Sequence, residues 1–191
     1  MMQSRFRLTD SDKPADIAEY LASLGDVRHD PAKSKKIVFF DTFDWRLFSE
    51  GKSISIQTGK SGPEVNVVDH HKNEPIAVIP GHLPSGYADD LPPGHIRDII
   101  IDIIDVRRLL PCLEITSRQT AFTFRNKDGK ITLRMTMDKL RARNPNNGRP
   151  VPLGIYMSVE PVRGYVKAEK KACRLLSSKF EALPPTVDRK S

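Results

Sequence analysis

The sequence lacks long apolar runs, cysteine motifs and the common nucleotide-binding or hydrolase signatures. No stretch of its 191 residues approaches the roughly 20 apolar residues that span a bilayer. The first residues have no apolar core of a signal peptide, so we expect a cytoplasmic protein with no membrane partner. Cys112 and Cys173 stand far apart and in no CxxC pattern, which gives no sign of a metal site or a disulfide. No P-loop, GxSxG motif, internal repeat or low-complexity segment is present.

The composition is that of a folded domain with an excess of positive charge. Hydrophobic residues make up 38% and charged residues 29% of the chain, which excludes a disordered polypeptide. We expect a single domain over residues 1–183 and a C-terminal tail over residues 184–191. The formal net charge of +7 favours anionic partners, such as phosphate compounds, nucleic acid or acidic protein. The alternative is a basic surface that only contacts solvent.

Alternation of apolar and polar residues predicts mostly antiparallel strands, seven or eight in number. They cover residues 3–8, 37–42, 53–58, 65–69, 76–79, 120–125, 131–138 and 155–160. Helical spacing predicts a first helix capped by Ser11 and ended by Gly25, a short turn over residues 45–49, a helix within residues 96–110 and a last helix from Tyr165. Residues 80–95 form a loop rich in turn formers.

The polar sides of these strands carry arginines, and this favours a closed sheet around a polar interior. Arg5, Arg7, Arg125 and Arg134 recur on polar faces of separate strands, which indicates one shared anionic focus. The amphipathic helices need an apolar sheet surface to cover. A sandwich with exposed polar faces fits the same alternation, but the barrel fits both observations better.

Three passages resemble the CYTH superfamily of triphosphate tunnel proteins, which includes thiamine triphosphatases, inorganic triphosphatases and class IV adenylate cyclases. FFDTFDWRLFSEGKSISIQ resembles the family passage of YxDT, a leucine turn and LRxR. LLPCLEITSRQTAFTFRNKDGKITLRMTMDK resembles its hairpin region ending in ELALD, and IYMSVEPVRGY its late acidic strand. The three stand in the family's order and cover most of the chain. The resemblance implies an α+β fold, an eight-stranded antiparallel β-barrel with a tunnel and with helices packed outside.

The family's chemistry implies basic side chains that hold a triphosphate and carboxylates that hold Mg²⁺. The resemblance, together with the polar strand faces, gives as phosphate-binding candidates Arg5, Arg7, Arg118, Arg125 and Arg134, and as metal ligands Glu160 and Asp138. Arg118 and Arg125 are an odd number of residues apart, so on a regular strand their side chains point to opposite faces, and a β-bulge would be needed for both to face the same way.

The sequence departs from the family pattern where catalysis needs it most. The two glutamates of the first strand fall at Met1 and Gln3, and the two arginines of LRxR fall at Ser55 and Gln57. The glutamate of ELALD falls at Arg134, and one late glutamate at Ser158. Losing one oxyanion donor already costs about 2.7–4 kcal/mol of catalysis. The departures therefore predict a degenerate tunnel domain that binds a phosphate-rich anion (triphosphate, polyphosphate or nucleotide) with weak or no catalysis.

Three alternatives stay open at the level of sequence. The chain could be a divergent metal-dependent triphosphatase that uses Glu160 and Asp138. It could be a nucleic-acid or protein interaction module that uses a basic surface of Lys167, Lys170, Lys171 and Arg174, with Arg141 and Arg143 nearby in sequence. This hypothesis is less favoured because no aromatic residues alternate with these basic residues, as they do in proteins that bind single strands. Finally, the arginines could pair internally with Asp138 and Glu160 and bind nothing. The His70–His71 pair is expected to be polar surface, because neighbours on a strand point to opposite faces. Sequence does not fix the oligomeric state.

Overall fold

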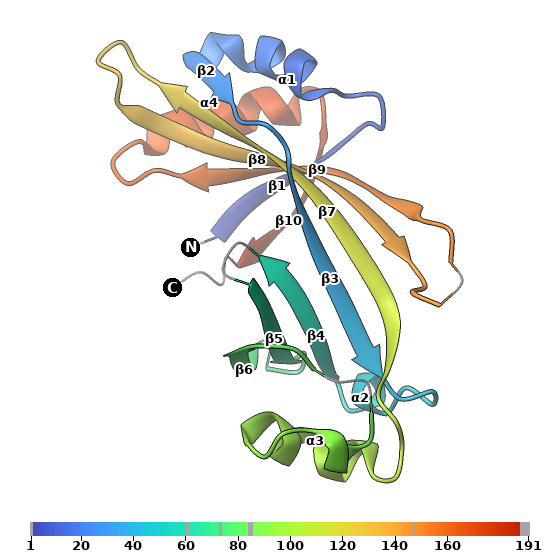
Figure 1. Ribbon diagram of the computed structural model, residues 1–191. Helices are drawn as coiled ribbons and strands as arrows, with labels where there is room; N and C mark the ends of the chain where they lie inside the picture. Colours follow the sequence, from blue (N-terminus) through green and yellow to red (C-terminus); the bar gives the residue numbers. More distant parts are fainter. Residues whose placement is uncertain (1, 60–61, 73, 84–85, 147, 188–191) are drawn as a thin grey trace. The chain divides into compact units, whose positions relative to one another are not determined.

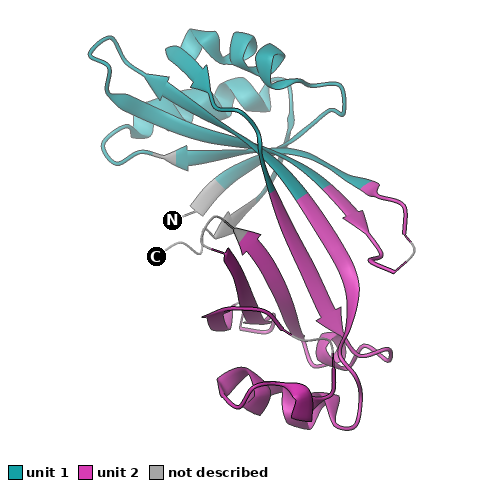
Figure 2. Cartoon of the chain, in the orientation of Figure 1, with its two compact units in different colours: residues 1–34, 117–140, 152–191 teal, residues 35–116, 141–151 magenta. Residues whose placement is uncertain are grey.

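The computed structural model describes residues 2–59, 62–72, 74–83, 86–146 and 148–187. Met1, where the resemblance places one missing glutamate, lies outside them. The chain divides into two compact units (Figure 2): unit 1 comprises residues 1–34, 117–140 and 152–191, and unit 2 residues 35–116 and 141–151. No helix in the described part of the chain is long and apolar enough to cross a membrane.

Ten strands and four α-helices make up the described chain (Figure 1). The strands are β1 (Met2–Leu8), β2 (Asp26–His29), β3 (Lys33–Asp41), β4 (Lys52–Gly59), β5 (Gly62–Asp69), β6 (Glu74–Pro80), β7 (Leu110–Arg125), β8 (Ile131–Arg143), β9 (Val151–Pro161) and β10 (Glu181–Val187). The α-helices are α1 (Pro14–Leu21), α2 (Arg46–Ser49), α3 (His95–Ile104) and α4 (Val166–Ser177), with 3-10 turns at Ala22–Leu24 and Ala88–Asp90.

The strands hydrogen-bond in the order β10-β1-β9-β8-β7-β3-β4-β5-β6, and β2 pairs with β7. The pairings of β1 with β9 and β10, of β2 with β7, of β4 with β3 and β5, and of β5 with β6 are all antiparallel. The predicted α+β class with an antiparallel sheet and helices packed on it is thus confirmed. The sheet has ten strands where eight were expected, and β10 and β6 stand at the two ends of the pairing order.

Unit 1 has one apolar sheet face, which α1 and α4 cover. Every second residue of four strands enters its core: Phe6 and Leu8 of β1, Phe122 and Phe124 of β7, Leu133, Met135 and Met137 of β8, and Ile155, Met157 and Val159 of β9. Ile17 and Leu21 of α1 and Ala172 and Leu176 of α4 pack against them. The alternation read from the sequence therefore assigns the faces of these strands correctly.

Unit 2 has its own core, in which α3 packs on β4 and β5. Ile96, Ile100 and Ile104 of α3 are buried together with Ile54, Val65 and Val67. This confirms a helix within residues 96–110, where the β-branched run also permitted a strand. Ser55, between Ile54 and Ile56 on β4, lies on the other face and pairs with Asn66 of β5.

Three local expectations need correction. Ser11 is not the cap of α1: Lys13 precedes the helix, Pro14 occupies its first turn, and the Ser11 hydroxyl is bonded to Thr9. The short β2 was not anticipated. β10 was not anticipated either, and it extends the described structure to Val187, into the segment expected to be a tail. Its prolines fit a strand at the end of the pairing order, where an N–H donor is dispensable.

Candidate functional site

Most of the predicted site residues share one face of unit 1, the face opposite the apolar core. Because Phe6 and Leu8 enter the core, Arg5 and Arg7 lie on the other face of β1. The same alternation places the following residues on that face, which we call the arginine face: Arg134 and Asp138 of β8, Tyr156, Ser158 and Glu160 of β9, and Ser117, Gln119 and Arg125 of β7. The sequence thus brings four of the five predicted arginines and both predicted metal ligands to one surface.

Arg5 is held in place on the arginine face without using its N–H groups. Its guanidinium lies over the Tyr156 ring, 4.1 Å from the ring centroid, and Arg5 pairs with Ser158 across β1 and β9. A cation–π contact of this kind orients the guanidinium while its five N–H donors stay available. Among the described residues, Arg5 forms no ion pair.

Arg134 is exposed and likewise forms no ion pair within the described part of the chain. Arg7 is exposed, lies across from Glu181 of β10 and also forms no ion pair among the described residues. Arg125 donates to the Gly129 carbonyl at 2.7 Å and lies across from Asp26 of β2, so it stabilises the hairpin turn. Arg5, Arg7 and Arg134 are therefore the arginines of this face whose donors no ion pair within the described residues uses, and Arg5 and Arg134 do not lie across from an acid in the pairings given above.

Asp138 binds neutral donors and not arginine. The Ser117 hydroxyl donates to its Oδ1 at 2.7 Å and the Gln119 amide to its Oδ2 at 3.2 Å. Glu160, on the neighbouring strand, forms no ion pair among the described residues. The alternative that the arginines pair internally with these two acids finds no ion pair in the described residues.

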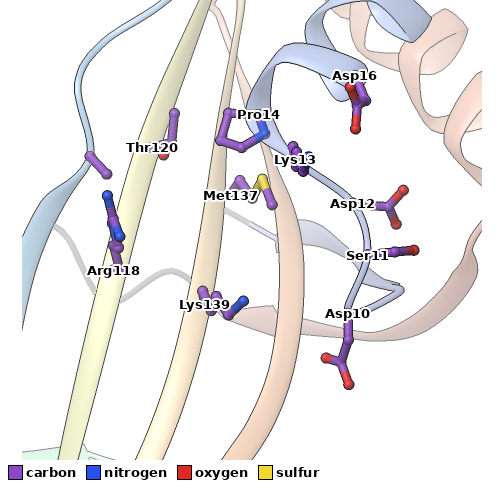
Figure 3. Close-up of a pocket in the computed structure, with 11 residues that line it drawn as sticks. Asp10, Ser11, Asp12, Lys13, Pro14, Asp16, Arg118, Thr120, Met137 and Lys139 are labelled. Carbon is purple, nitrogen blue, oxygen red and sulfur yellow. The ribbon is translucent and has the colours of Figure 1, made fainter.

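Arg118 lies on the opposite face of β7 and borders a cavity of about 660 Å³ (Figure 3). Lys139 and Met137 of β8 and the buried Thr120 share the strand wall, and the segment that enters α1 forms the other wall with Asp10, Asp12 and Asp16. With Lys13, the lining has three basic and three acidic side chains. The charges balance, so the cavity has no net preference for an anion, and Arg118 does not join the arginine face.

Unit 2 contains a buried carboxylate that sequence reasoning missed. Arg143 binds Glu114 with both forks of its guanidinium, Nε to Oε1 at 2.7 Å and Nη2 to Oε2 at 2.9 Å, and Lys36 Nζ lies 2.7 Å from Oε2. The pKa of Glu114 lies below its ordinary value, mainly because Arg143 donates hydrogen bonds to the carboxylate. The hydrogen bond and the positive charge of Lys36 lower this pKa further. One acid inside the apolar run LPCLEIT was the available signal. Arg143, grouped above with a basic surface, is thus committed to the fold.

The residues present supply few ligands for a metal. Among the described residues, no three His, Cys, Asp or Glu side chains gather as a metal site would require. His70 and His71 are exposed, as expected for polar surface, and His70 Nε2 lies 2.9 Å from the Ser53 hydroxyl. Mg²⁺ accepts one or two carboxylates when phosphate oxygens complete its shell. Asp138 and Glu160 lie on the same face of the neighbouring strands β8 and β9, and they are two carboxylates, the number that such a shell can use.

Comparisons with known proteins agree with this fold. The chain is similar to the crystal structure of a candidate adenylate cyclase from Bacillus halodurans, with a TM-score of 0.52, 12% identity and coverage of 98% of this chain and 93% of that one. It is also similar, at a TM-score of 0.46 and 14% identity over 94% and 89% of the two chains, to a candidate adenylyl cyclase from Hippeastrum with a dominant triphosphatase activity. A candidate adenylate cyclase from Vibrio parahaemolyticus matches at a TM-score of 0.46 and 10% identity over 98% and 94%.

Neither a family model nor a curated protein matches the sequence. At these identities, structural similarity shows the fold alone. The Bacillus halodurans protein nevertheless matches along almost the whole of both chains. The antiparallel fold with helices packed on the sheet is therefore confirmed.

Proposed function

We propose that the arginine face binds a phosphate-rich anion: tripolyphosphate, polyphosphate or the triphosphate of a nucleotide. One observation carries this proposal. Arg5 and Arg134 form no ion pair among the described residues, whereas Asp138 on the same face is bound by a hydroxyl and an amide. Guanidinium groups bind phosphate oxygens through charge-assisted bonds that are about twice as strong as neutral ones.

The spacing of these arginines favours an extended anion. β9 lies between β1 and β8, so Arg5 and Arg134 stand two strand spacings apart. Neighbouring strands are about 4.8 Å apart, which separates the two backbones by about 10 Å. A chain of phosphates offers oxygens to both guanidinium groups, whereas a single phosphate offers three or four oxygens at one point. We expect tripolyphosphate to bind more tightly than inorganic phosphate.

Weak or absent catalysis completes the proposal. Ser55 and Gln57 stand where the resemblance places two phosphate-binding arginines, and Gln3 stands where it places a glutamate. Asp138 and Glu160 would hold Mg²⁺, which supplies charge neutralisation to the phosphate oxygens when bound. With these two carboxylates alone, the protein residues orient the anion more than they activate a nucleophile.

Isothermal titration calorimetry with tripolyphosphate, with and without Mg²⁺, tests this proposal. Arg134→Ala and Arg5→Ala should each weaken binding by about tenfold, since a lost charge-assisted bond is worth about 1.5 kcal/mol or more. Arg118→Ala is the matched control and should leave binding unchanged, because Arg118 is exposed on the opposite face of β7. No heat at tens of micromolar protein would overturn the proposal.

A second candidate is a divergent metal-dependent triphosphatase. The presence of Asp138 and Glu160 on the face that carries Arg134 favours it, because acids and arginines then meet one ligand. Phosphate release from tripolyphosphate or a nucleoside triphosphate, dependent on Mg²⁺ and lost in Glu160→Ala, would support this activity. Release that is unchanged in that variant would count against it.

A further inference from the structure

Unit 2 contains a second, chemically different cavity of about 380 Å³, built largely from aromatic residues. Its lining includes Phe39 and Phe40 of β3, Trp45 and Phe48 of the α2 segment, and Leu113 of β7. Polar atoms are confined to a few side chains: Asp41, Lys52, Ser53, His70 and Cys112. Mostly apolar walls with a few fixed polar groups, at this volume, are typical of a small-molecule site.

The aromatic walls are exposed to a degree that folding alone does not explain. Trp45 is 51% and Phe48 74% exposed. Trp45 also has a φ of 57°, a left-handed backbone conformation that bulky residues rarely adopt and that is found more often at functional sites. The Trp45 side chain is thus half exposed where it lines the cavity.

The cavity walls are held in place before any ligand arrives. The buried carboxylate of Asp41 accepts the backbone N–H of Leu47 at 3.0 Å and of Phe48 at 3.0 Å, which fixes α2 and the aromatic residues on it. Preorganised walls reduce the entropy lost on binding. Asp41 uses its oxygens in these bonds and adds little as a ligand-binding group.

The remaining polar groups favour a negatively charged or acceptor group on the ligand. Lys52 donates to the Glu50 carbonyl at 3.4 Å and forms no ion pair among the described residues. Asp69 lies across from Lys52, but its Oδ1 already accepts the N–H groups of His71 and Lys72. The Cys112 thiol donates to the Phe39 carbonyl at 3.3 Å, and His70 is bonded to Ser53. Lys52 is therefore the donor with spare capacity.

We propose that this cavity of unit 2 binds a planar aromatic molecule that carries a carboxylate or sulfonate. The rings of Trp45, Phe48 and Phe39 contact the aromatic plane, and the Lys52 ammonium contacts the anionic group. This site is distinct in its residues and its ligand chemistry from the arginine face, and it does not depend on phosphate binding there.

The sequence offers a direct reporter, because Trp45 is its single tryptophan. Titrating the full chain with anilinonaphthalene sulfonate should quench Trp45 fluorescence and sensitise emission from the probe. Phe48→Ala should weaken probe binding by about tenfold, the loss expected for one aromatic contact. The matched control is Phe43→Ala: Phe43 is 70% exposed on the same segment but does not line the cavity. Lys52→Ala should weaken the binding of the sulfonate probe more than it weakens the binding of an uncharged naphthalene.

Alkylation provides an independent readout, since each unit holds one free cysteine. Bound probe should slow iodoacetamide labelling of Cys112, which lines the cavity, and leave Cys173 of α4 unaffected. Equal loss of binding in Phe43→Ala and Phe48→Ala would overturn the proposal in favour of general surface adhesion. A signal that scales with self-association of the chain, or displacement of the probe by tripolyphosphate, would overturn it as well.

Discussion

Two acids of unit 2, Asp41 and Glu114, differ from two acids of unit 1, Asp138 and Glu160, in what binds them. In unit 2, Asp41 accepts three backbone N–H bonds and Glu114 binds two cations, and both are buried. In unit 1, Asp138 is half-buried with neutral partners, and Glu160 forms no ion pair among the described residues. A carboxylate whose bonds are all internal stabilises the fold, whereas one with spare oxygens is available to a ligand. The comparison separates acids whose oxygens are fully bonded within the chain from acids that keep oxygens free for a ligand.

The largest expected effect is that of Asp41→Ala. The substitution removes the acceptor of the N–H groups of Thr42, Leu47 and Phe48. At about 1 kcal/mol for each hydrogen bond, the free energy of unfolding should fall by about 3 kcal/mol. Urea denaturation measures it. Asp44→Ala is the control on the same segment: Asp44 is exposed, and the loss of its ion pairs with Arg46 and Arg107 should cost about 1 kcal/mol, less than Asp41→Ala.

Glu114→Gln should have the next largest effect, and a pH dependence that identifies its cause. The variant leaves Arg143 and Lys36 without their carboxylate, and should lose about 1–3 kcal/mol at neutral pH, the cost of an unmade buried hydrogen bond. Because folding lowers the pKa of Glu114 below its ordinary 4.5, its contribution is present above that pH and is lost as pH falls through the folded-state pKa.

Denaturation curves between about pH 7 and pH 3 measure this linkage. The stability difference between the native chain and Glu114→Gln should shrink as the pH falls below 4.5. A difference that stays constant over this range would show that Glu114 does not contribute through its charge.

Asp138→Asn should barely change stability but should change anion binding. Asparagine keeps one oxygen for one of the two donors, Ser117 or Gln119, and the other can turn to accept from its NH2 group, so unfolding should change by about 1 kcal/mol or less, one neutral hydrogen bond at most. In the presence of a chelator that removes Mg²⁺, the loss of one negative charge near the ligand should raise the affinity for tripolyphosphate a few-fold, because about 1 kcal/mol of Coulomb repulsion is removed. Tighter binding with Mg²⁺ as well would rule out Asp138 as a metal ligand. Calorimetry of both states separates the two roles.

The smallest effect concerns the thiols, one in each unit. Burial, and then the charge of Asp41, raise the pKa of Cys112, and burial raises that of Cys173, partly offset by a hydrogen bond with Ser4. The thiolate is the reactive form, so both cysteines should alkylate more slowly than a free thiol at pH 8 and speed up above pH 9. Mass spectrometry with iodoacetamide follows each site. Rapid labelling at pH 7 would contradict the burial of the thiols.

Much of the fold could be predicted from the sequence because alternation and helical spacing are local signals. The faces of β1, β8 and β9 follow directly from it. β2 escaped because four residues are too few for a pattern, and β10 because Pro184 and Pro185 indicate an irregular segment. Glu114 escaped because its burial depends on Lys36 and Arg143, which are distant in sequence.

The candidate site was only partly predictable for the same reason. Parity alone places Arg5, Arg134 and Asp138 on one face. The same alternation places Arg118 and Arg125 on opposite faces of β7. Arg118 lies on the core side and lines the cavity beside α1. Which arginines keep free donors depends on contacts such as those of Arg125 with the Gly129 carbonyl, which no linear pattern records.

The hydrogen bonds that Asp41 accepts from the backbone of α2 have a consequence for the order in which the chain folds. They reach only to Leu47 and Phe48, six and seven residues along the chain. Loops this short close far faster than the pairing of strands distant in sequence, because the loop entropy lost is small. We therefore expect the amide hydrogens of Leu47 and Phe48 to be protected early in a refolding pulse-labelling experiment, ahead of those in β1 and β10. The part of the sequence that carries the family resemblance would then act as a local nucleus for the fold.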